Sequence, residues 1–199
     1  MVTLSANQLL EPANAAFQHW WQCNGEWVEP LNQRREGESG VQLLESQDPL
    51  QPTLYSKRQT GHLYRSVRHP LGRPTIVREL YAYQAFERLG VPVPKLVFGS
   101  ARKHEGQWQA LLVTQALTGF ISLEQWYQEP HSPEHTQCML AALGETLARM
   151  HRGRWQHGCC YAKHLFVRIQ EDEGRSPRAD TALLDLEKSR RRWRTADAS

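Results

Sequence analysis

The stretch from His157 to Asp185 constrains the fold more strongly than any other part of this sequence. A polar loop leads into a short apolar segment, a turn containing Gly174 and Pro177 follows, and a second apolar segment ends at Asp185. Two short apolar segments joined by turn residues are typical of a β-hairpin. The sequence therefore predicts a hairpin with polar groups at both ends, which would bring His164 and Asp185 within reach of each other.

The composition indicates a globular chain. The 199 residues are 40% hydrophobic and 23% charged, which suits one domain or two small lobes and not a disordered chain. No apolar run approaches the roughly 18 residues of a transmembrane helix. Residues 1–17 contain no basic residue and no sustained apolar core, so no signal peptide is expected and the predicted location is cytoplasmic.

The four cysteines do not form a disulfide pattern. Cys159 and Cys160 are adjacent, Cys23 and Cys138 lie far from them, and the chain has no C-x-x-C pair. Cysteines without a disulfide pattern are typical of proteins in a reducing compartment.

Two other kinds of site could use the loop residues. Zinc would accept His157, Cys159, Cys160 and His164, but structural zinc sites favour two separated pairs of ligands, and four ligands within eight residues would strain the loop. A Cys159 nucleophile with His157 as its base is disfavoured because no orienting acid is adjacent. The simplest alternative is that both cysteines are small packed side chains.

Strand patterns dominate the first half of the chain and helical patterns the second. The predicted strands cover 25–35, 41–44, 53–59, 93–98 and 107–115, and the basic segment 61–74 is predicted to be a loop or a hairpin. Apolar residues at three- and four-residue spacing predict a helix over 75–89, which starts near Pro74 and is closed by Gly90.

After a hinge expected at 115–119, the predicted helices cover 121–127 and 133–150, and 186–194 also has a helical pattern. The chain is thus predicted to be α+β, with a strand-rich part at 1–116 and a helix-rich part at 117–199.

This order of elements resembles the two-lobed protein-kinase-like fold, with an antiparallel β-sheet and one helix in the N-lobe and a mostly helical, short C-lobe. Segment 54–58 (LYSKR) resembles the strand that carries a phosphate-binding lysine, and Arg78-Glu79 resembles the helix with its acidic partner. Segment 157–164 (HGCCYAKH) resembles a catalytic loop, and segment 184–187 (LDLE) a metal-binding strand end. The His164 ending and the Asp185-Leu186 pair are similar to the lipopolysaccharide kinase (Kdo/WaaP) family, in particular its InaA-like branch.

The resemblance implies an ATP-dependent phosphotransferase that acts on a sugar hydroxyl of the lipopolysaccharide core. Lys57 would hold phosphate and Glu79 would orient it. Asp185 would bind Mg²⁺, a hard cation that prefers carboxylate oxygen, and His164 stands where common kinases have the second metal ligand, Asn.

Gln115 and Leu117, in the expected hinge, would contact the nucleotide. The turn 36–40 (EGESG) could cover the nucleotide, although its two acids would repel phosphate and a plain hairpin turn explains it equally well.

Each of these residues also has an ordinary structural interpretation. Lys57 could be an exposed strand lysine, Glu87 competes with Glu79 on the same helix, and Asp185 could cap a following helix. Imidazole is a poor Mg²⁺ ligand compared with an amide oxygen, so His164 could instead donate a hydrogen bond to phosphate or to Asp185.

The loop departs from the kinase pattern at its third residue. Cys159 stands where kinases have the Asp that orients the substrate hydroxyl, and no carboxylate occurs between His157 and His164. General base catalysis contributes about 10²–10⁴-fold in rate, so the sequence predicts slow transfer. The alternative is a pseudokinase, a nucleotide-binding module with a regulatory or scaffold role.

The C-terminal basic cluster, Lys188 to Arg194 with Trp193 inside it, could be a solvated helix. Its other interpretation is a contact with a phosphorylated glycolipid or an anionic membrane surface, which would place the protein peripherally at the inner face of a membrane. Net charge is only +3, and no recognition helix or RNA-stacking motif indicates a specific nucleic-acid partner. A second basic patch comprises Arg65, Arg68, His69 and Arg73.

Overall fold

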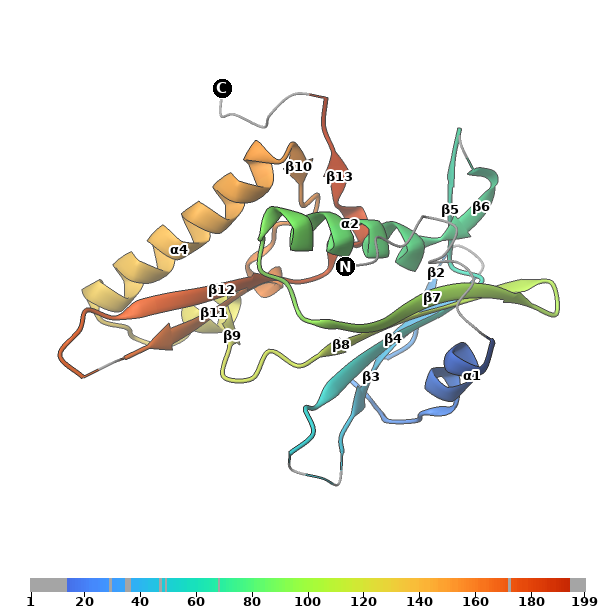
Figure 1. Ribbon diagram of the computed structural model, residues 1–199, viewed down its shortest axis with the longest axis horizontal. Helices are drawn as coiled ribbons and strands as arrows, with labels where there is room; N and C mark the ends of the chain where they lie inside the picture. The colour runs from blue at the N-terminus through green and yellow to red at the C-terminus, as the bar shows by residue number, and fades with distance from the viewer. Residues whose placement is uncertain are drawn as a thin grey trace. The chain divides into compact units, whose positions relative to one another are not determined.

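The computed structural model describes residues 14–28, 30–34, 37–46, 48, 50–67, 69–171 and 173–193 (Figure 1). These residues form two compact units. Unit 1 contains the described residues up to Leu80 together with Lys95–Ala116, and unit 2 contains Tyr81–Pro94 and the described residues from Leu117 onward. The residues Glu36, Arg68 and Arg194, which belong to the predicted turn and basic patches, lie outside the described residues.

Unit 1 is built on an antiparallel sheet. Its strands are β1 (Glu26–Trp27), β2 (Asn32–Arg34), β3 (Gly37–Leu44), β4 (Leu54–Thr60), β7 (Leu96–His104) and β8 (Gln107–Gln115). They are ordered β1-β3-β4-β8-β7, and β2 also pairs with β3. Figure 1 shows β3, β4, β8 and β7 as a twisted layer. Strand β8 is central and buries the run Ala110–Thr114, which explains its nearly continuous apolar sequence.

A helix that the sequence did not predict precedes this sheet. Helix α1 (Asn14–Gln22) contains Phe17, Trp20 and Trp21, aromatic residues suited to packing onto the sheet. The packing is present: the Phe17 ring is 1% exposed, and the Phe17 and Trp20 rings lie 6.4 and 6.2 Å from the ring of Phe98 on β7. Tertiary contacts with the sheet therefore stabilise a segment whose own helical pattern is weak.

Between the sheet strands β4 and β7 the chain forms a second hairpin and helix α2. Strands β5 (Leu63–Ser66) and β6 (His69–Pro74) pair with each other, which decides the basic segment in favour of a hairpin. Helix α2 spans Thr75–Leu89, as predicted. Its start is fixed by Gln59, whose amide donates to Thr75 Oγ1 (2.7 Å) and accepts from the Ile76 N–H (3.1 Å). Pro74 is the last residue of β6, one position before the helix.

Unit 2 contains the remaining elements. They are β9 (Ile121–Ser122), α3 (Leu123–Trp126), α4 (Pro133–Arg152), β10 (Trp155–Gln156), the 3₁₀ turn η1 (Ala162–His164), β11 (Leu165–Gln170), β12 (Arg178–Leu183), the 3₁₀ turn η2 (Leu186–Lys188) and β13 (Arg190–Arg191). Strands β11 and β12 form the predicted hairpin, with β9 added at its edge. Helix α4 lies along β12 (Figure 1), where the Thr146 and Thr181 hydroxyls are 2.7 Å apart.

The helix expected over 186–194 is wrong. The chain makes only the three-residue turn η2 and then forms β13, which pairs antiparallel with β10 through Trp155 opposite Arg191 and Gln156 opposite Arg190. Between them Ser189 is 2% exposed, and its hydroxyl donates to the His157 carbonyl (3.1 Å). Pairing with a strand more than 30 residues earlier outweighs the local helical pattern.

Other predicted bounds also change. The strand expected over 25–35 contains two short strands, β1 and β2, and residues 37–40 of the predicted turn belong to β3, which therefore begins before the expected 41. Segment 121–127 begins as β9 before becoming α3, whose N-cap Ser122 forms a capping box with Gln125. The strand expected over 93–98 begins at Leu96 and continues to His104. Among the described residues no helix is long and apolar enough to cross a membrane.

Candidate functional site

Within unit 1, the structure brings Lys57 of β4 and Glu79 of α2 into a close ion pair. Lys57 Nζ lies 2.8 Å from Glu79 Oε2, and their side chains are 18% and 3% exposed. The competing acid Glu87 lies on an exposed face of the same helix. A buried carboxylate needs a charged or hydrogen-bonding partner, so the pair orients the lysine while leaving its ammonium group partly accessible.

Both partners are held by regular structure. Lys57 is paired on both sides in the sheet, opposite Val41 of β3 and Leu112 of β8. Two residues further along β4, Gln59 anchors the start of α2 through Thr75 and Ile76. The same strand therefore supplies the lysine and fixes the helix that carries its acid.

In unit 2, His157 ties the loop to the end of β12. The ring is 1% exposed, and its Nε2–H donates to the Leu184 carbonyl (2.9 Å) while Nδ1 accepts from the Cys159 N–H (3.3 Å). Burial is the main cause that lowers the pKa of His157 below its ordinary value; the hydrogen bond to Leu184 opposes it, and neighbouring His164 adds to it. The neutral ring therefore uses both nitrogens to place the loop beside the residue that precedes Asp185.

His164 lies between the same loop and Asp185. Its Nδ1 is 2.8 Å from the Cys159 carbonyl oxygen, and its Nε2 is 3.6 Å from Asp185 Oδ2. The imidazole is 12% exposed, and it stacks against the His157 ring with centroids 6.2 Å apart. The proximity of His164 and Asp185 follows from the hairpin register, in which Leu165 lies opposite Leu183.

Asp185 does not cap a helix. Its backbone is left-handed (φ 56°, ψ 65°), and its side chain makes no cap hydrogen bond to η2. Non-glycine residues adopt this conformation at a cost, and they concentrate at functional sites. The side chain is 38% exposed.

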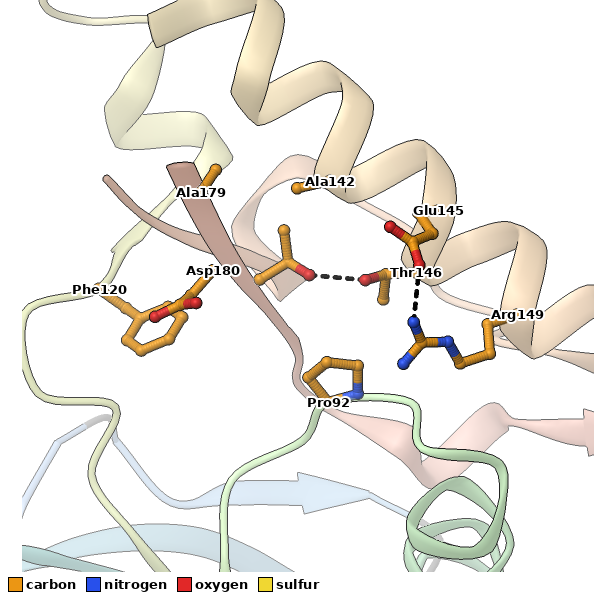
Figure 2. A pocket seen from close by; sticks show the side chains of 9 residues that line it. Pro92, Phe120, Ala142, Glu145, Thr146, Arg149, Ala179 and Asp180 are labelled. Carbon is orange, nitrogen blue, oxygen red and sulfur yellow. Dashed lines mark hydrogen bonds and ion pairs between the residues drawn. The ribbon is translucent and has the colours of Figure 1, made fainter. Parts of the chain in front are cut away.

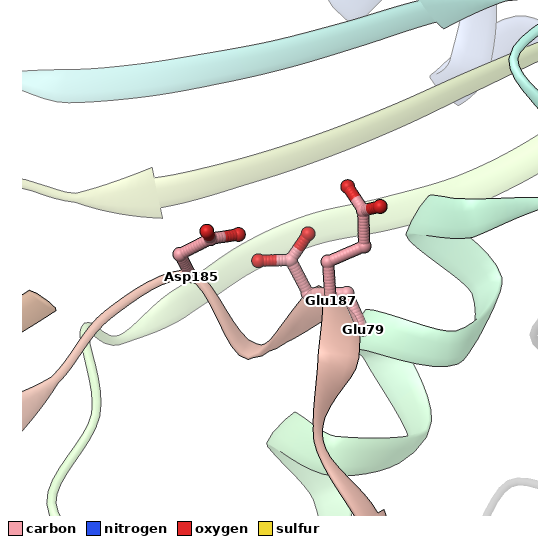
Figure 3. A group of neighbouring side chains, drawn as sticks. All are labelled: Glu79, Asp185 and Glu187. Carbon is pink, nitrogen blue, oxygen red and sulfur yellow. The ribbon is translucent and has the colours of Figure 1, made fainter. Parts of the chain in front are cut away.

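Glu187, the last residue of the LDLE segment, is an acid of unit 2 to which the sequence pattern assigned no role of its own. Its carboxylate has an oxygen within 4.8 Å of an Asp185 oxygen. Figure 3 shows both side chains extending from the segment after β12, and Glu79 on α2. The signal was present as Asp-Leu-Glu, but a continuous helix over 186–194 would have turned the second acid elsewhere. Carboxylates at this spacing, beside an imidazole, are able to bind a divalent cation.

Cys159 contributes to the loop through its backbone. Cys159 is 5% exposed, and its N–H and carbonyl group bond His157 and His164. Cys160 is exposed, and partial desolvation raises the pKa of its thiol above the ordinary value. All four cysteines are free. Within the described ranges, no cluster of three metal-ligating groups includes either loop cysteine, so the zinc alternative finds no support.

The expected hinge residues lie in ordinary backbone structure. Gln115 ends β8, and its N–H donates to the Lys95 carbonyl (2.9 Å); the Leu117 carbonyl accepts from the Phe120 N–H (3.2 Å). Both side chains are half-buried. Their contact with a nucleotide stays a prediction.

The basic cluster is well exposed where it is described. Lys188, the arginines at 190–192 and Trp193 are exposed, the indole at 98%. In the other basic patch Arg65 is exposed and Arg73 half-buried.

A cavity of about 340 Å³ lies between α4 and β12 in unit 2 (Figure 2). Its charged groups already bond within the protein: Arg149 contacts Glu145 (2.8 Å) and the Gly90 carbonyl, and Asp180 accepts from Arg168 (2.6 Å). Because these charged side chains are already paired within the protein, the cavity is a weak candidate for a ligand site.

Comparisons with known proteins agree with this arrangement. Residues 18–199 match the lipopolysaccharide kinase (Kdo/WaaP) family. The chain is 50% identical over 182 residues to Protein InaA of Escherichia coli (strain K12), covering 89% of this chain and 80% of that protein.

The fold is similar to that of a solved protein kinase, the Rio2 kinase from Chaetomium thermophilum in its ADP/Mg²⁺-phosphoaspartate complex. The TM-score is 0.52 at 11% identity, over 89% of this chain and 52% of the Rio2 chain. This chain thus spans about half the length of the Rio2 chain, and the likeness shows the protein-kinase-like fold. The family match over most of the chain and the InaA relative support a kinase-like phosphotransferase. The chain belongs to the lipopolysaccharide kinase (Kdo/WaaP) family.

Proposed function

We propose that this protein is an ATP-dependent phosphotransferase that acts on a sugar hydroxyl, with the lipopolysaccharide core as the acceptor. The observation that carries the proposal is the Lys57–Glu79 ion pair at 2.8 Å. A triphosphate is strongly anionic. Protein kinases neutralise part of this charge with a lysine whose side chain is positioned by an ion pair with a carboxylate. The acceptor class comes from the family alone.

The remaining roles fall to the other predicted residues. Lys57 binds phosphate oxygens, and Glu79 keeps its ammonium group in place. Asp185 and His164 hold the divalent cation, which when bound neutralises phosphate charge, and Gln115 and Leu117 contact the nucleotide. Glu187 adds negative charge beside Asp185. Phosphoryl transfer depends mainly on such positioning and charge compensation.

The second candidate function, a pseudokinase that binds nucleotide without transferring phosphate, is favoured by one observation. Cys159 occupies the position of the catalytic Asp, and it is 5% exposed. A neutral thiol is a weaker partner for a hydroxyl proton than a carboxylate. Loss of general base catalysis costs about 10²–10⁴-fold in rate, which leaves either slow transfer or binding alone.

The first test is nucleotide binding by titration calorimetry, with ATP alone and with ATP and Mg²⁺. We expect Mg²⁺-dependent binding that Asp185→Asn abolishes and that Glu79→Gln weakens at least tenfold, because Lys57 is then no longer held. Glu87→Gln removes an acid from the exposed face of the same helix and should leave binding unchanged. An absence of ATP binding by the unaltered protein would refute both candidate functions.

The second test separates the two candidates. Cys159→Asp restores a carboxylate at the base position, and for an attenuated kinase we expect phosphate transfer to a purified lipopolysaccharide acceptor to rise at least tenfold. Cys160→Asp, one residue along the loop, is the matched control and should not raise the rate. A folded Cys159→Asp protein that binds ATP but forms no product would favour the pseudokinase.

The basic cluster, defined as Lys188, Arg190, Arg191, Arg192 and Trp193, is proposed to contact an anionic membrane surface. Clustered basic side chains attract anionic headgroups, and an exposed indole suits the interfacial region. Such a contact would hold the protein peripherally at the inner face of a membrane, near a glycolipid acceptor.

A further inference from the structure

The β5–β6 hairpin of unit 1 carries two aliphatic side chains that lie in open solvent. Val67, in the turn between the strands, is 102% exposed, and Leu71 of β6 is 90% exposed. Single exposed apolar residues are common on protein surfaces and need no explanation. Two of them on one short hairpin form an apolar end, which indicates a contact outside the chain.

The base of this hairpin is anchored in unit 1. His62 is 7% exposed, and its carbonyl accepts from the Thr75 N–H at the start of α2 (3.3 Å). The Arg78 guanidinium of α2 lies over the Tyr64 ring of β5, 5.0 Å from its centroid. Among the described strands, β5 and β6 pair with each other and not with the main sheet, and Figure 1 shows them extending away from its strands. The hairpin is therefore fixed at its base and accessible at its end.

The charge of the hairpin has one sign. Segment 61–74 (GHLYRSVRHPLGRP) contains three arginines, two histidines and no acidic residue. Arg65 is exposed, two residues before Val67. The exposed Leu50 of the same unit, by contrast, follows Asp48, whose carboxylate accepts from the Leu50 N–H (2.9 Å). The hairpin thus combines apolar surface with a positive charge that complements an anionic partner.

We propose that the end of the β5–β6 hairpin inserts into an anionic lipid bilayer. Val67 and Leu71 enter the acyl boundary, and the arginines contact the headgroup phosphates. The strength of such binding increases with the buried apolar area and with the attraction to anionic lipids, so a bilayer uses both features of the hairpin. A nucleic acid would attract the arginines through its phosphates, but phosphates offer no apolar environment to the aliphatic side chains.

This contact goes beyond the proposed function. The hairpin belongs to unit 1, whereas the basic cluster belongs to unit 2. Insertion of the hairpin also needs no nucleotide, so a failure of this inference leaves the phosphotransferase proposal untouched.

Hydrogen exchange on the unaltered protein locates the contact. The protein is mixed with vesicles of phosphatidylcholine and phosphatidylglycerol in equal parts, and with vesicles of phosphatidylcholine alone. We expect the mixed vesicles to slow exchange in the β5–β6 hairpin, and the neutral vesicles to leave it unchanged. The segment around Leu50 should exchange at the same rate in both. Vesicle binding without slower exchange in the hairpin would overturn the inference. A lack of binding to the mixed vesicles would overturn it as well, and would leave a protein as the partner of the exposed end.

A double variant measures the apolar contribution. Val67→Asn together with Leu71→Asn keeps every arginine, and we expect its partitioning onto the mixed vesicles to fall by roughly tenfold or more, because two aliphatic side chains no longer leave water. The matched control is Val28→Asn together with Leu50→Asn, which alters two exposed apolar residues of the same unit (51% and 91% exposed) and should bind as the unaltered protein does.

The salt dependence and the basic cluster provide the remaining comparison. Binding of the hairpin variant should still weaken as salt is added, since its charges are unchanged. Normal binding by the hairpin variant, with loss of binding only when the arginines at 190–192 are changed, would assign the membrane contact to the basic cluster alone and overturn the inference.

Discussion

At the scale of single residues, hydrogen-bonding groups and not charge alone define the candidate site. Glu79 is buried because Lys57 compensates its charge. His157 uses one ring nitrogen to position Cys159 and the other to hold Leu184. The loop lacks the carboxylate found in common kinases. Its conformation is stabilised instead by hydrogen bonds between histidine rings and backbone groups.

The neutral, buried His157 predicts a pH dependence of stability. Its pKa in the folded protein is lowered, so the unfolded chain binds the extra proton and the free energy of unfolding falls as pH drops through about 6.5. The contribution is present above that pH and is lost toward the lowered pKa of the folded state.

We expect this slope in urea unfolding between about pH 7.5 and 5.5, and we expect it to be smaller in His157→Gln, whose amide can still donate to Leu184. His104→Gln, at an exposed site, should keep the slope of the unaltered protein. An unchanged slope in His157→Gln would show that other groups cause the dependence.

At the scale of elements, short backbone pairings outweigh local propensity. Strand β13 forms because β10 offers it a partner, and the intervening η2 then carries Leu186 into the core at 0% exposure. Gly158 makes the approach between loop and turn possible: it has a φ of +79°, and an added Cβ would overlap the Lys188 backbone carbonyl. The candidate site therefore depends on a close contact between two backbone segments.

Gly158→Ala should be markedly destabilising. A left-handed backbone costs an alanine about 1–2 kcal/mol, and the overlap with Lys188 adds about 1–3 kcal/mol. Gly174→Ala is the matched control, because Gly174 has a similar φ of +72° but open space around its Cβ position. Equal losses in urea unfolding would mean that the contact with Lys188 has no energetic weight.

At the scale of the whole molecule, local charge matters more than net charge. The chain carries only +3, and a uniform field of that size steers ligands weakly at physiological ionic strength. Any attraction to an anionic surface must therefore come from clustered residues, such as the exposed residues 188 and 190–193 of unit 2.

Vesicle binding tests this proposal. Basic residues near an anionic bilayer contribute about 1 kcal/mol each, so changing the arginines at 190–192 to glutamate should reduce sedimentation with phosphatidylglycerol vesicles more than tenfold. The same number of charge reversals at Arg88, Lys103 and Arg175, which are exposed but dispersed, should have a smaller effect. Equal losses for the two variants would argue against a defined contact surface.

The sequence by itself determined the elements whose patterns are local. Helix α2 and strand β8 have the predicted bounds because the apolar spacing of the first and the continuous apolar run of the second need no distant partner to be recognised. The β11–β12 hairpin followed from two apolar segments around a turn, and with it the proximity of His164 and Asp185. The family and the protein-kinase-like fold also followed from the order of these motifs.

Only the tertiary structure decided the features that depend on distant partners. Helix α1 is stabilised by aromatic contacts with β7, and β13 by pairing with β10, and neither contact leaves a periodic signal in the segment itself. The position of the Glu187 carboxylate depends on the turn η2. The hydrogen bond that His164 Nδ1 donates depends on the Cys159 carbonyl oxygen. The sequence determines the chemical type of each side chain. The groups that the fold places around a side chain determine which of its atoms donate hydrogen bonds and which accept them.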